Sequence, residues 1–446
     1  MRSLFGTDGI RARADEFPLD TATMFALGEA LAHRLASDGP RSILLGMDTR
    51  ESGPRIAHSL TAGIQAGGGV AKFIGIVPTP AVAFLCRTST AAAGISISAS
   101  HNPFEDNGVK VFGSDGMKLS DALEKAIEEE LLALRREGKT VDDAPLVEAP
   151  ELIRKYEDFL VGGLPPGALA GQRVVLDTGH GAAYRIGPDV FRRAGAEVTV
   201  VNAAPNGRNI NDQSGALHPE GLADVVRREG AHLGIAFDGD ADRAIFVDDQ
   251  GTVRNGDEIL YLWAVREKTE GKLAGNIVVA TVMSNLGFEK KLEDEGICLL
   301  RAAVGDKYVL EMMVENHAML GGEQSGHIID LLVHTTGDGL HTGLMVSQLL
   351  RDVSKPFSQL QTFEPMPQVL LNLKVSSKPP IESLETYSRV AAECESELAG
   401  RGRILVRYSG TENLARVMVE GESDDQIRAI AARLLESLRE EIGRDS

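Results

Sequence analysis

A serine at the end of a predicted strand is the first residue in this sequence that could do covalent chemistry. Ser100 lies within residues 98–103, directly after residues 94–98, where small and β-branched side chains alternate as in a buried strand. Rigid backbone would position its hydroxyl and the loop would leave it open to a ligand, as a nucleophile or a phosphoryl carrier requires. The alternative is a plain turn, because an asparagine before a proline, here Asn102 and Pro103, is typical of turns.

An acidic turn is the second candidate. Residues 233–237 are typical of a strand, and three carboxylates follow at alternating positions, Asp238, Asp240 and Asp242. Oxygen ligands that converge from a tight turn favour a hard divalent cation such as magnesium, calcium or manganese. An EF-hand would need glycine at the sixth and glutamate at the twelfth loop position, where this chain has Arg243 and Asp249. We therefore predict a magnesium site completed by a substrate phosphate, with a metal-free acidic turn as the alternative.

A glycine-rich loop, residues 321–327, brings together an acid, an amide, a hydroxyl and an imidazole. Such a set can bind the hydroxyl groups of a sugar, and a plain turn is the alternative. The candidate residues of this loop are Gly322, Glu323, Gln324, Ser325 and His327.

A second loop, near the end of the chain, joins the predicted strands 404–407 and 415–419. Arginines bracket it, and a hydroxyl-bearing, glycine-containing segment lies between them. Arginine offers a fork of donors and loop amides add more, so this loop is predicted to surround a phosphate; a hairpin with exposed arginines is the alternative. The candidate residues are Arg407, Ser409, Gly410, Thr411 and Arg416.

The elements that must position these residues follow an α/β rhythm. Residues 5–11 come first, and their two glycines suggest a tight loop that leaves Arg11 free to meet a ligand, with a surface turn as the alternative. Strand-like runs such as 70–76 then alternate with helical patterns such as the one that follows Ser120, which favours parallel βαβ units. We place four domains, at 1–150, 151–252, 253–366 and 367–446.

Composition limits the class of protein. The 446 residues, 43% of them hydrophobic, are enough for three or four domains of about 150 residues. A net charge of −19 disfavours nucleic acid and anionic membranes as partners but leaves room for a local basic pocket. Three scattered cysteines fit a reducing, cytoplasmic location, and no run of about 18 apolar residues predicts a membrane span.

Four stretches together resemble the α-D-phosphohexomutase superfamily, namely residues 98–103, 238–243, 322–327 and 407–411. They occur in the family's order and span most of the chain. Within the superfamily, residues 5–11 and Gln324 are similar to those of the bacterial phosphoglucosamine mutases. The resemblance implies a heart-shaped protein with a central cleft, built from three related α/β domains and a smaller C-terminal α+β domain that closes on the substrate phosphate.

The resemblance also implies a reaction. Ser100 would carry a phosphoryl group and, with Asp238, Asp240 and Asp242, would hold one Mg²⁺ per chain. Phosphoserine would donate to O1 of glucosamine 6-phosphate, and the resulting 1,6-bisphosphate would turn around and rephosphorylate the serine. Release of glucosamine 1-phosphate would supply UDP-N-acetylglucosamine for cell-wall precursors, and a sugar 1,6-bisphosphate would be the activator. The residues implied near the transferred group are Arg11, Lys110, Arg243 and His327.

Some family positions differ in this chain. Ala12 stands where glycine is common, and Tyr408 and Asn413 stand where proline is common, so we expect a less rigid phosphate loop. Gly322, Glu323, Gln324 and Ser325 would bind the sugar, and the arginine-bracketed loop would bind the phosphate that is not reacting. Other hexose phosphates as substrates, a phosphosugar sensor without turnover, and a metal-dependent phosphatase are the alternatives, and a homodimer is left open.

Overall fold

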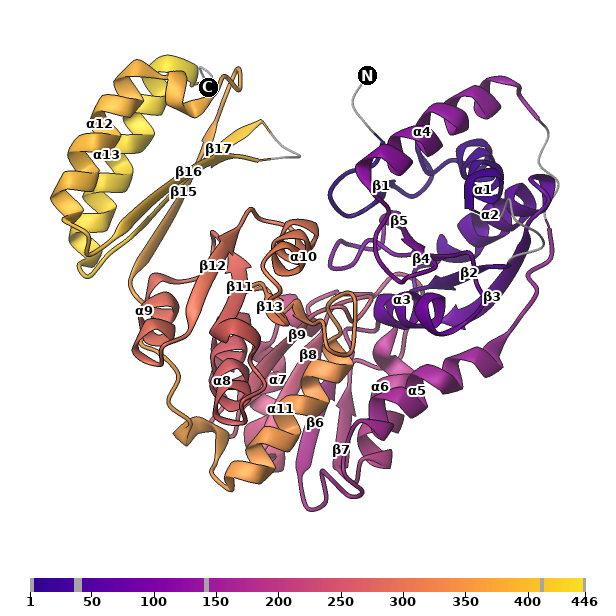
Figure 1. Cartoon of the computed structure of the whole chain (residues 1–446), viewed down its shortest axis with the longest axis horizontal. Helices are drawn as coiled ribbons and strands as arrows, with labels where there is room; N and C mark the ends of the chain where they lie inside the picture. The colour runs from indigo at the N-terminus through magenta and orange to yellow at the C-terminus, as the bar shows by residue number, and fades with distance from the viewer. Residues whose placement is uncertain (1–3, 36–41, 140–143, 410–412, 444–446) are drawn as a thin grey trace. The chain divides into compact units, whose positions relative to one another are not determined.

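The first sheet of the molecule mixes parallel and antiparallel strands (Figure 1). The computed structural model describes residues 4–35, 42–139, 144–409 and 413–443. Parallel pairing joins the three strands that are linked through helices, and antiparallel pairing adds the remaining two at one edge. Across the sheet, the order is β1 (Ile10–Arg13), β5 (Asp106–Gly113), β4 (Ala93–Ile97), β2 (Ser42–Met47) and β3 (Val70–Ile76).

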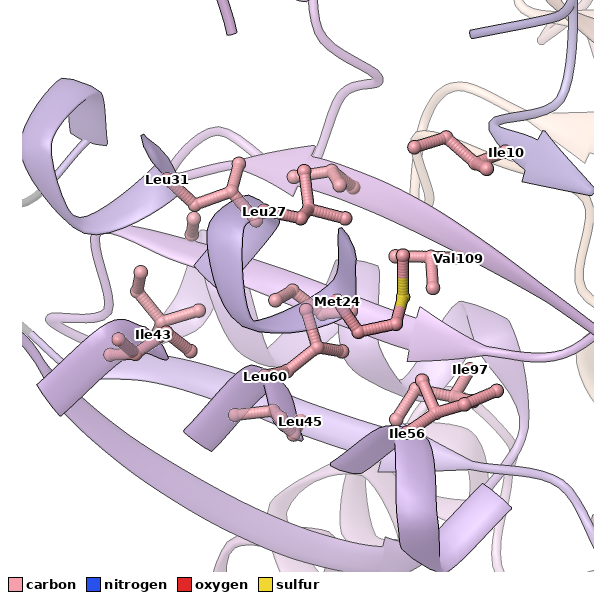
Figure 2. Packing of buried hydrophobic residues seen from close by; sticks show 14 of the residues in the cluster. Ile10, Met24, Leu27, Leu31, Ile43, Leu45, Ile56, Leu60, Ile97 and Val109 are labelled. Atoms are coloured by element: carbon pink, nitrogen blue, oxygen red, sulfur yellow. The ribbon is translucent and has the colours of Figure 1, made fainter. Parts of the chain in front are cut away.

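Helices cover both faces of this sheet, which explains why β2 is buried along its whole length. On one face lie α1 (Thr21–Leu35), α2 (Gly53–Ala66) and α4 (Asp121–Arg136), whose apolar side chains pack on the strands. Figure 2 shows Met24 and Leu27 of α1 and Leu60 of α2 beside Ile43 and Val109 of the sheet. The opposite face is covered by α3 (Thr79–Thr88).

Glycines of the first sheet explain how closely α3 packs. A side-chain carbon on Gly46 would lie 2.6 Å from Val77 and 2.8 Å from Val82, and one on Gly94 would lie 2.3 Å from Cys86 Sγ. The absence of side chains at these two strand positions therefore lets α3 lie directly against the sheet.

The second sheet repeats the design of the first. Its order is β10 (Val253–Arg254), β9 (Ala244–Asp248), β8 (Leu233–Phe237), β6 (Arg173–Asp177) and β7 (Glu197–Val201). Strand β6 pairs in parallel with β7 and β8, and β9 is antiparallel to β8, as β5 is to β4. Its helices are α5 (Ile153–Gly162), α6 (Ala183–Arg193) and α7 (Glu220–Glu229).

A third, four-stranded sheet has the same order without the last edge strand. It consists of β14 (Ile328–Asp330), β13 (Leu320–Gly322), β11 (Ile277–Thr281) and β12 (Cys298–Ala302). Its helices are α8 (Gly256–Thr269), α9 (Leu286–Asp294), α10 (Asp306–Glu315) and α11 (Gly339–Val353). Three connections therefore occupy the same place in three sheets: β4 to β5, β8 to β9, and β13 to β14. These connections contain Ser100, the acidic turn and the start of the sugar loop.

The chain divides into two compact units. The first comprises Met1–Thr281 with Leu300–Gln361, and the second comprises Val282–Leu299 with Thr362–Ser446. Most of the second unit is a three-stranded antiparallel sheet in the order β15 (Gln368–Lys374), β17 (Leu414–Glu420) and β16 (Arg403–Tyr408). Helices α12 (Glu385–Leu398) and α13 (Asp424–Ile442) bury one face of it, with Val417, Val419, Ile430 and Leu434 in the core.

The sequence-based interpretation of the fold is confirmed. Strands β3 and β8 occupy residues 70–76 and 233–237, as predicted, and α4 follows Ser120. The fold class, three related α/β domains and a smaller α+β domain, is also confirmed. The four domain boundaries stay a prediction. In the described part of the chain, no helix has both the length and the apolar character needed to cross a bilayer.

Candidate active site

Ser100 lies at a strained point of the first sheet's β4–β5 connection. Its φ is +52°, in the left-handed region that non-glycine residues seldom adopt, and the residue is 1% exposed. The serine amide donates to Ser98 Oγ at 2.9 Å, and Ser98 Oγ in turn donates to Asp48 Oδ2 at 2.6 Å. The strained conformation is thus fixed by its surroundings, as is typical of reactive residues.

The acidic turn meets the serine loop directly. Ser100 Oγ donates to Asp238 Oδ2 at 2.5 Å, so the hydroxyl is already beside the first of the three carboxylates. A side-chain carbon on Gly239 would lie 2.5 Å from the carbonyl oxygen of Ser100, a contact that only glycine permits. Two residues 138 positions apart therefore share one polar site.

The three carboxylates suit a divalent cation. Ligand oxygens of Asp238, Asp240 and Asp242 all lie within 4.8 Å of one another, and the three residues are buried. Oδ1 of Asp240 and Oδ1 of Asp242 are buried without a hydrogen-bond partner in the described structure. Burial, together with repulsion from Asp242 and Asp240, raises the pKa of Asp238 well above its usual range. Hard oxygen ligands held this closely match what Mg²⁺ requires.

Lys110 joins the acidic turn to the N-terminal loop. Its Nζ, on a side chain 2% exposed, lies 2.9 Å from Asp240 Oδ2, 3.0 Å from Asp242 Oδ2 and 3.1 Å from Asp8 Oδ2. Burial alone would lower the pKa of Lys110, but these carboxylates raise it well above its ordinary value. Arg11 pairs with the same Oδ2 of Asp8, so both predicted cations reach the site through one aspartate.

Two further groups stand around the serine hydroxyl and the turn. Arg243 donates its amide to Asp238 Oδ1 at 3.2 Å, and its Nε lies 3.9 Å from Asp242 Oδ1. His101, whose Nδ1 is 3.3 Å from Ser100 Oγ, has its pKa lowered to about 4 by burial and by nearby arginines. Sequence reasoning did not assign a role to His101, although it directly follows the serine.

The sugar loop lies on the other side of the acidic turn. His327 Nδ1 is 3.6 Å from Asp242 Oδ1, while the amide of Gly337 donates to His327 Nε2 at 3.1 Å. Glu323 accepts from the amide of Gly305 at 3.1 Å and from the hydroxyl of Ser325 at 3.2 Å. The first unit therefore joins the serine, the acidic turn and the sugar loop, including Gly322 at the end of β13 and Gln324, whose carbonyl accepts from Gly256.

The predicted phosphate loop belongs to the second unit. Arg407 of β16 and Arg416 of β17 stand directly opposite each other in the antiparallel register, so their side chains share one face. Burial and the neighbouring Arg416 lower the pKa of Arg407. Ser409 is buried, its amide donates to the Leu414 carbonyl at 2.8 Å, and Lys378 Nζ donates to its carbonyl at 2.7 Å. Gly410 and Thr411 lie outside the described residues.

Several residues that hold the site were missed from the sequence. The guanidinium of Arg50, 1% exposed, donates to the carbonyls of Ser100 and Asn102 and pairs with Asp48. Asn211 Nδ2 donates to the same Ser100 carbonyl at 2.9 Å, and Thr79 Oγ1 donates to Asp240 Oδ2 at 2.6 Å. These partners lie far away in sequence, and the only signal was their place directly after a strand or in a turn-rich loop.

Family comparisons define the class of protein to which this fold and site belong. The phosphoglucomutase/phosphomannomutase family matches in four successive parts: alpha/beta/alpha domain I at residues 2–137, domain II at 163–251, domain III at 255–366 and the C-terminal domain at 370–437. A phosphoglucosamine mutase from Solibacter usitatus is 45% identical over 444 residues, which cover 99% of each chain. The chain belongs to the phosphoglucosamine mutase family.

Solved structures share the fold. A phosphoglucomutase/phosphomannomutase family protein from Burkholderia thailandensis has a TM-score of 0.81 at 22% identity, covering 99% of this chain and 98% of its own. An N-acetylphosphoglucosamine mutase from Aspergillus fumigatus, solved with GlcNAc-6P and magnesium, has a TM-score of 0.66 at 17% identity, with coverage of 98% and 95%. At these identities, the likeness concerns the fold.

Proposed function

We propose that this chain interconverts glucosamine 6-phosphate and glucosamine 1-phosphate through a phosphorylated Ser100. The observation that carries the proposal is the 2.5 Å contact between Ser100 Oγ and Asp238, inside a cluster of buried carboxylates and cations. A carrier hydroxyl, a place for a divalent ion and positive charge therefore occur together, as phosphoryl transfer requires. The name of the 45% identical relative supports glucosamine phosphate as the sugar.

The donor set supports magnesium as the ion, at one per chain. Asp238, Asp240, Asp242 and an oxygen on Ser100 would hold it, using the two buried carboxylate oxygens described above. When bound, the ion supplies positive charge beside the phosphoryl group in transit. Arg243 adjoins Asp238 and Asp242, and Lys110 adjoins Asp240 and Asp242, so both add charge there without leaving their present partners.

The serine exchanges one phosphoryl group per half-reaction. Phosphoserine gives its phosphoryl group to O1 of glucosamine 6-phosphate, and O1 loses its proton as the serine hydroxyl re-forms. After the 1,6-bisphosphate reverses its orientation, Ser100 Oγ loses its proton, takes the phosphoryl group from O6 and leaves glucosamine 1-phosphate. A sugar 1,6-bisphosphate therefore activates a serine that has lost its phosphoryl group.

The remaining site residues bind what does not react. Glu323 and Ser325, already hydrogen-bonded to each other, would bind sugar hydroxyls together with Gly322 and Gln324. In the second unit, Arg407, Arg416 and Ser409, with Gly410 and Thr411, would bind the distal phosphate. Arg11 and His327 would act near the transferred group, from the far sides of Asp8 and Asp242.

The setting of this activity is part of the proposal. Domains at 1–150, 151–252, 253–366 and 367–446 would supply the serine, the metal turn, the sugar loop and the phosphate loop. Three free cysteines fit action in the cytoplasm, where glucosamine 1-phosphate would feed UDP-N-acetylglucosamine formation for the cell wall. The partner is a phosphorylated hexosamine, without nucleic acid or membrane.

The test combines turnover with protein mass. Purified protein with Mg²⁺ and a trace of glucose 1,6-bisphosphate is assayed with the 6-phosphates of glucosamine, glucose and mannose. We expect glucosamine 6-phosphate to have the highest kcat/KM and intact mass spectrometry to show one phosphoryl group, which Ser100→Ala removes. A preference for glucose or mannose would replace the substrate, and phosphate release that matches substrate loss would indicate a phosphatase. Unchanged turnover in Ser100→Ala would refute the carrier role.

A further inference from the structure

We infer that Lys118 is a positioning residue that holds the sugar-binding carboxylate of Glu323 in register with the serine and acidic turn. The inference rests on the proposed function, because it assigns Glu323 to the sugar. Lys118 follows the turn after β5, and its side chain is 13% exposed. It touches none of the reacting atoms, so any effect on the reaction must pass through its neighbours.

Lys118 bridges two loops that come from different sheets. Its Nζ lies 2.7 Å from Asp8 Oδ1 in the N-terminal loop and donates to Asp306 Oδ2 at 2.5 Å, at the start of α10. Burial alone would lower the pKa of Lys118, but Asp306 and Asp8 outweigh it and keep the ammonium charged. One buried cation therefore joins two carboxylates that would otherwise repel each other.

On the side of α10, the bridge ends at the sugar loop. Asp306 is the first residue of α10, and Gly305 before it has a φ of +133° and donates its amide to Glu323 Oε1 at 3.1 Å. Fixing Asp306 fixes this amide, because the two residues are consecutive. The orientation of the Glu323 carboxylate therefore depends on Lys118 through one ion pair and one peptide unit.

On the other side, the bridge ends at the acidic turn. Asp8 uses Oδ1 for Lys118 and Oδ2 for Lys110, and Lys110 contacts Asp240 and Asp242. A continuous series of charged contacts thus runs from the acidic turn to the sugar loop. In such a series, a shift of about 1 Å at one member can cost 10²-fold in rate, because the sugar would be presented out of line with the serine.

A neighbouring lysine offers a matched control. Lys307, one residue after Asp306, also bridges towards α4: it pairs with Asp121 and lies 3.7 Å from Glu124. This bridge connects nearly the same segments, but its carboxylate partners are on α4 and not in the loops around the site. Lys307→Met therefore removes an ion-pair bridge of the same kind without removing the link to Asp8 or the Asp306 carboxylate.

The first experiment is a double-mutant cycle on kcat/KM for glucosamine 6-phosphate in the full-length protein. Lys118→Met is expected to lose at least about tenfold, mostly through KM, with partial recovery in Lys118→Arg. Because Lys118 acts through Glu323, adding Lys118→Met to Glu323→Gln should cost much less than it does alone. Lys307→Met should leave kcat/KM within about twofold in either background. Fully additive losses from Lys118→Met and Glu323→Gln would overturn the inference.

The second experiment does not depend on turnover. Hydrogen–deuterium exchange is compared for peptides covering residues 303–308 and 320–326, and both should exchange faster in Lys118→Met but not in Lys307→Met. Equal exchange in wild type and Lys118→Met would also overturn the inference. If wild type does not convert glucosamine phosphates, the proposed function fails while this comparison still decides the positioning role. Should Lys118→Met not fold, Asp306→Asn breaks the same ion pair from its other end and is measured in the same way.

Discussion

The first unit and the second unit present positive charge in different ways. In the first, Lys110 is enclosed by Asp8, Asp240 and Asp242 at 2.9–3.1 Å, so its charge is balanced within the protein. In the second, Arg407 and Arg416 face each other across two strands, and Arg416 helps to lower the pKa of Arg407. A balanced cluster suits a group that must be both gained and released, whereas paired guanidinium groups suit an anion held throughout a reaction.

The largest effect that would sharpen this comparison comes from the serine. Ser100→Ala removes the oxygen that exchanges the phosphoryl group, so we expect turnover to fall by at least about 10³-fold while circular dichroism stays unchanged. Arg407 and Arg416 are untouched by this change. Isothermal calorimetry should therefore still detect glucosamine 6-phosphate binding, and loss of binding would show that the two units do not divide the work in this way.

Removal of divalent cations should affect the first unit alone. We expect EDTA to lower turnover more than about 10²-fold and Mg²⁺ to restore it, because three buried carboxylates await a counter-charge. Mg²⁺ should also raise Tm, since a ligand at 100 times its Kd stabilises a protein by about 2.7 kcal/mol. Asp242→Asn should reduce that Tm shift, and an identical shift in wild type and variant would contradict the metal site.

The close approach of the serine loop and the acidic turn can be tested with one methyl group. Gly239→Ala places a carbon 2.5 Å from the Ser100 carbonyl, so the loops must separate. We expect a loss of about 1–3 kcal/mol in stability from overpacking. Activity should fall by about tenfold or more because Ser100 and Asp238 move apart. Gly221→Ala, where no atom lies within 4 Å of the new carbon, is the control.

In the second unit, the shape of the guanidinium can be separated from its charge. Arg407→Lys keeps the positive charge but loses the fork of donors, so we expect KM for glucosamine 6-phosphate to rise by about five- to tenfold, with a smaller change in kcat. The midpoint of Mg²⁺ dependence should not move. A change in Mg²⁺ dependence equal to that in KM would show that Arg407 acts on the transferring group.

The smallest effect concerns acid stability. Every histidine of the chain lies in the first unit, and burial lowers the pKa of His334 to about 3, below the ordinary value of about 6.5. Because the unfolded chain binds this proton more readily, its contribution to stability is lost as pH falls from 6.5 towards 3, by up to about 1.4 kcal/mol per pH unit. His334→Phe should flatten that part of the curve in urea titrations, and an unchanged slope would contradict this assignment.

Local patterns were enough to predict the reactive loops but not what holds them. The acidic turn follows a strand whose limits the hydrophobic run defines, so Asp238, Asp240 and Asp242 could be placed from the sequence. Arg50 and Asn211 could not, because their partner is a backbone carbonyl 50 and 111 residues away, and any residue type supplies one. Likewise, nothing in the residues around Lys118 indicates Asp306, which lies 188 positions later.

The repeated strand order has a consequence for how such a catalyst arises. A chain that copies one sheet three times begins with three equivalent connections, and here the contacts among Ser100, Asp238, Asp242 and His327 show those connections meeting. Duplication thus creates a shared chamber before any of its walls has a specialised task. Each copy is then free to diverge, one into a donor of phosphorus, one into an anchor for an ion, and one into a reader of the hexose ring.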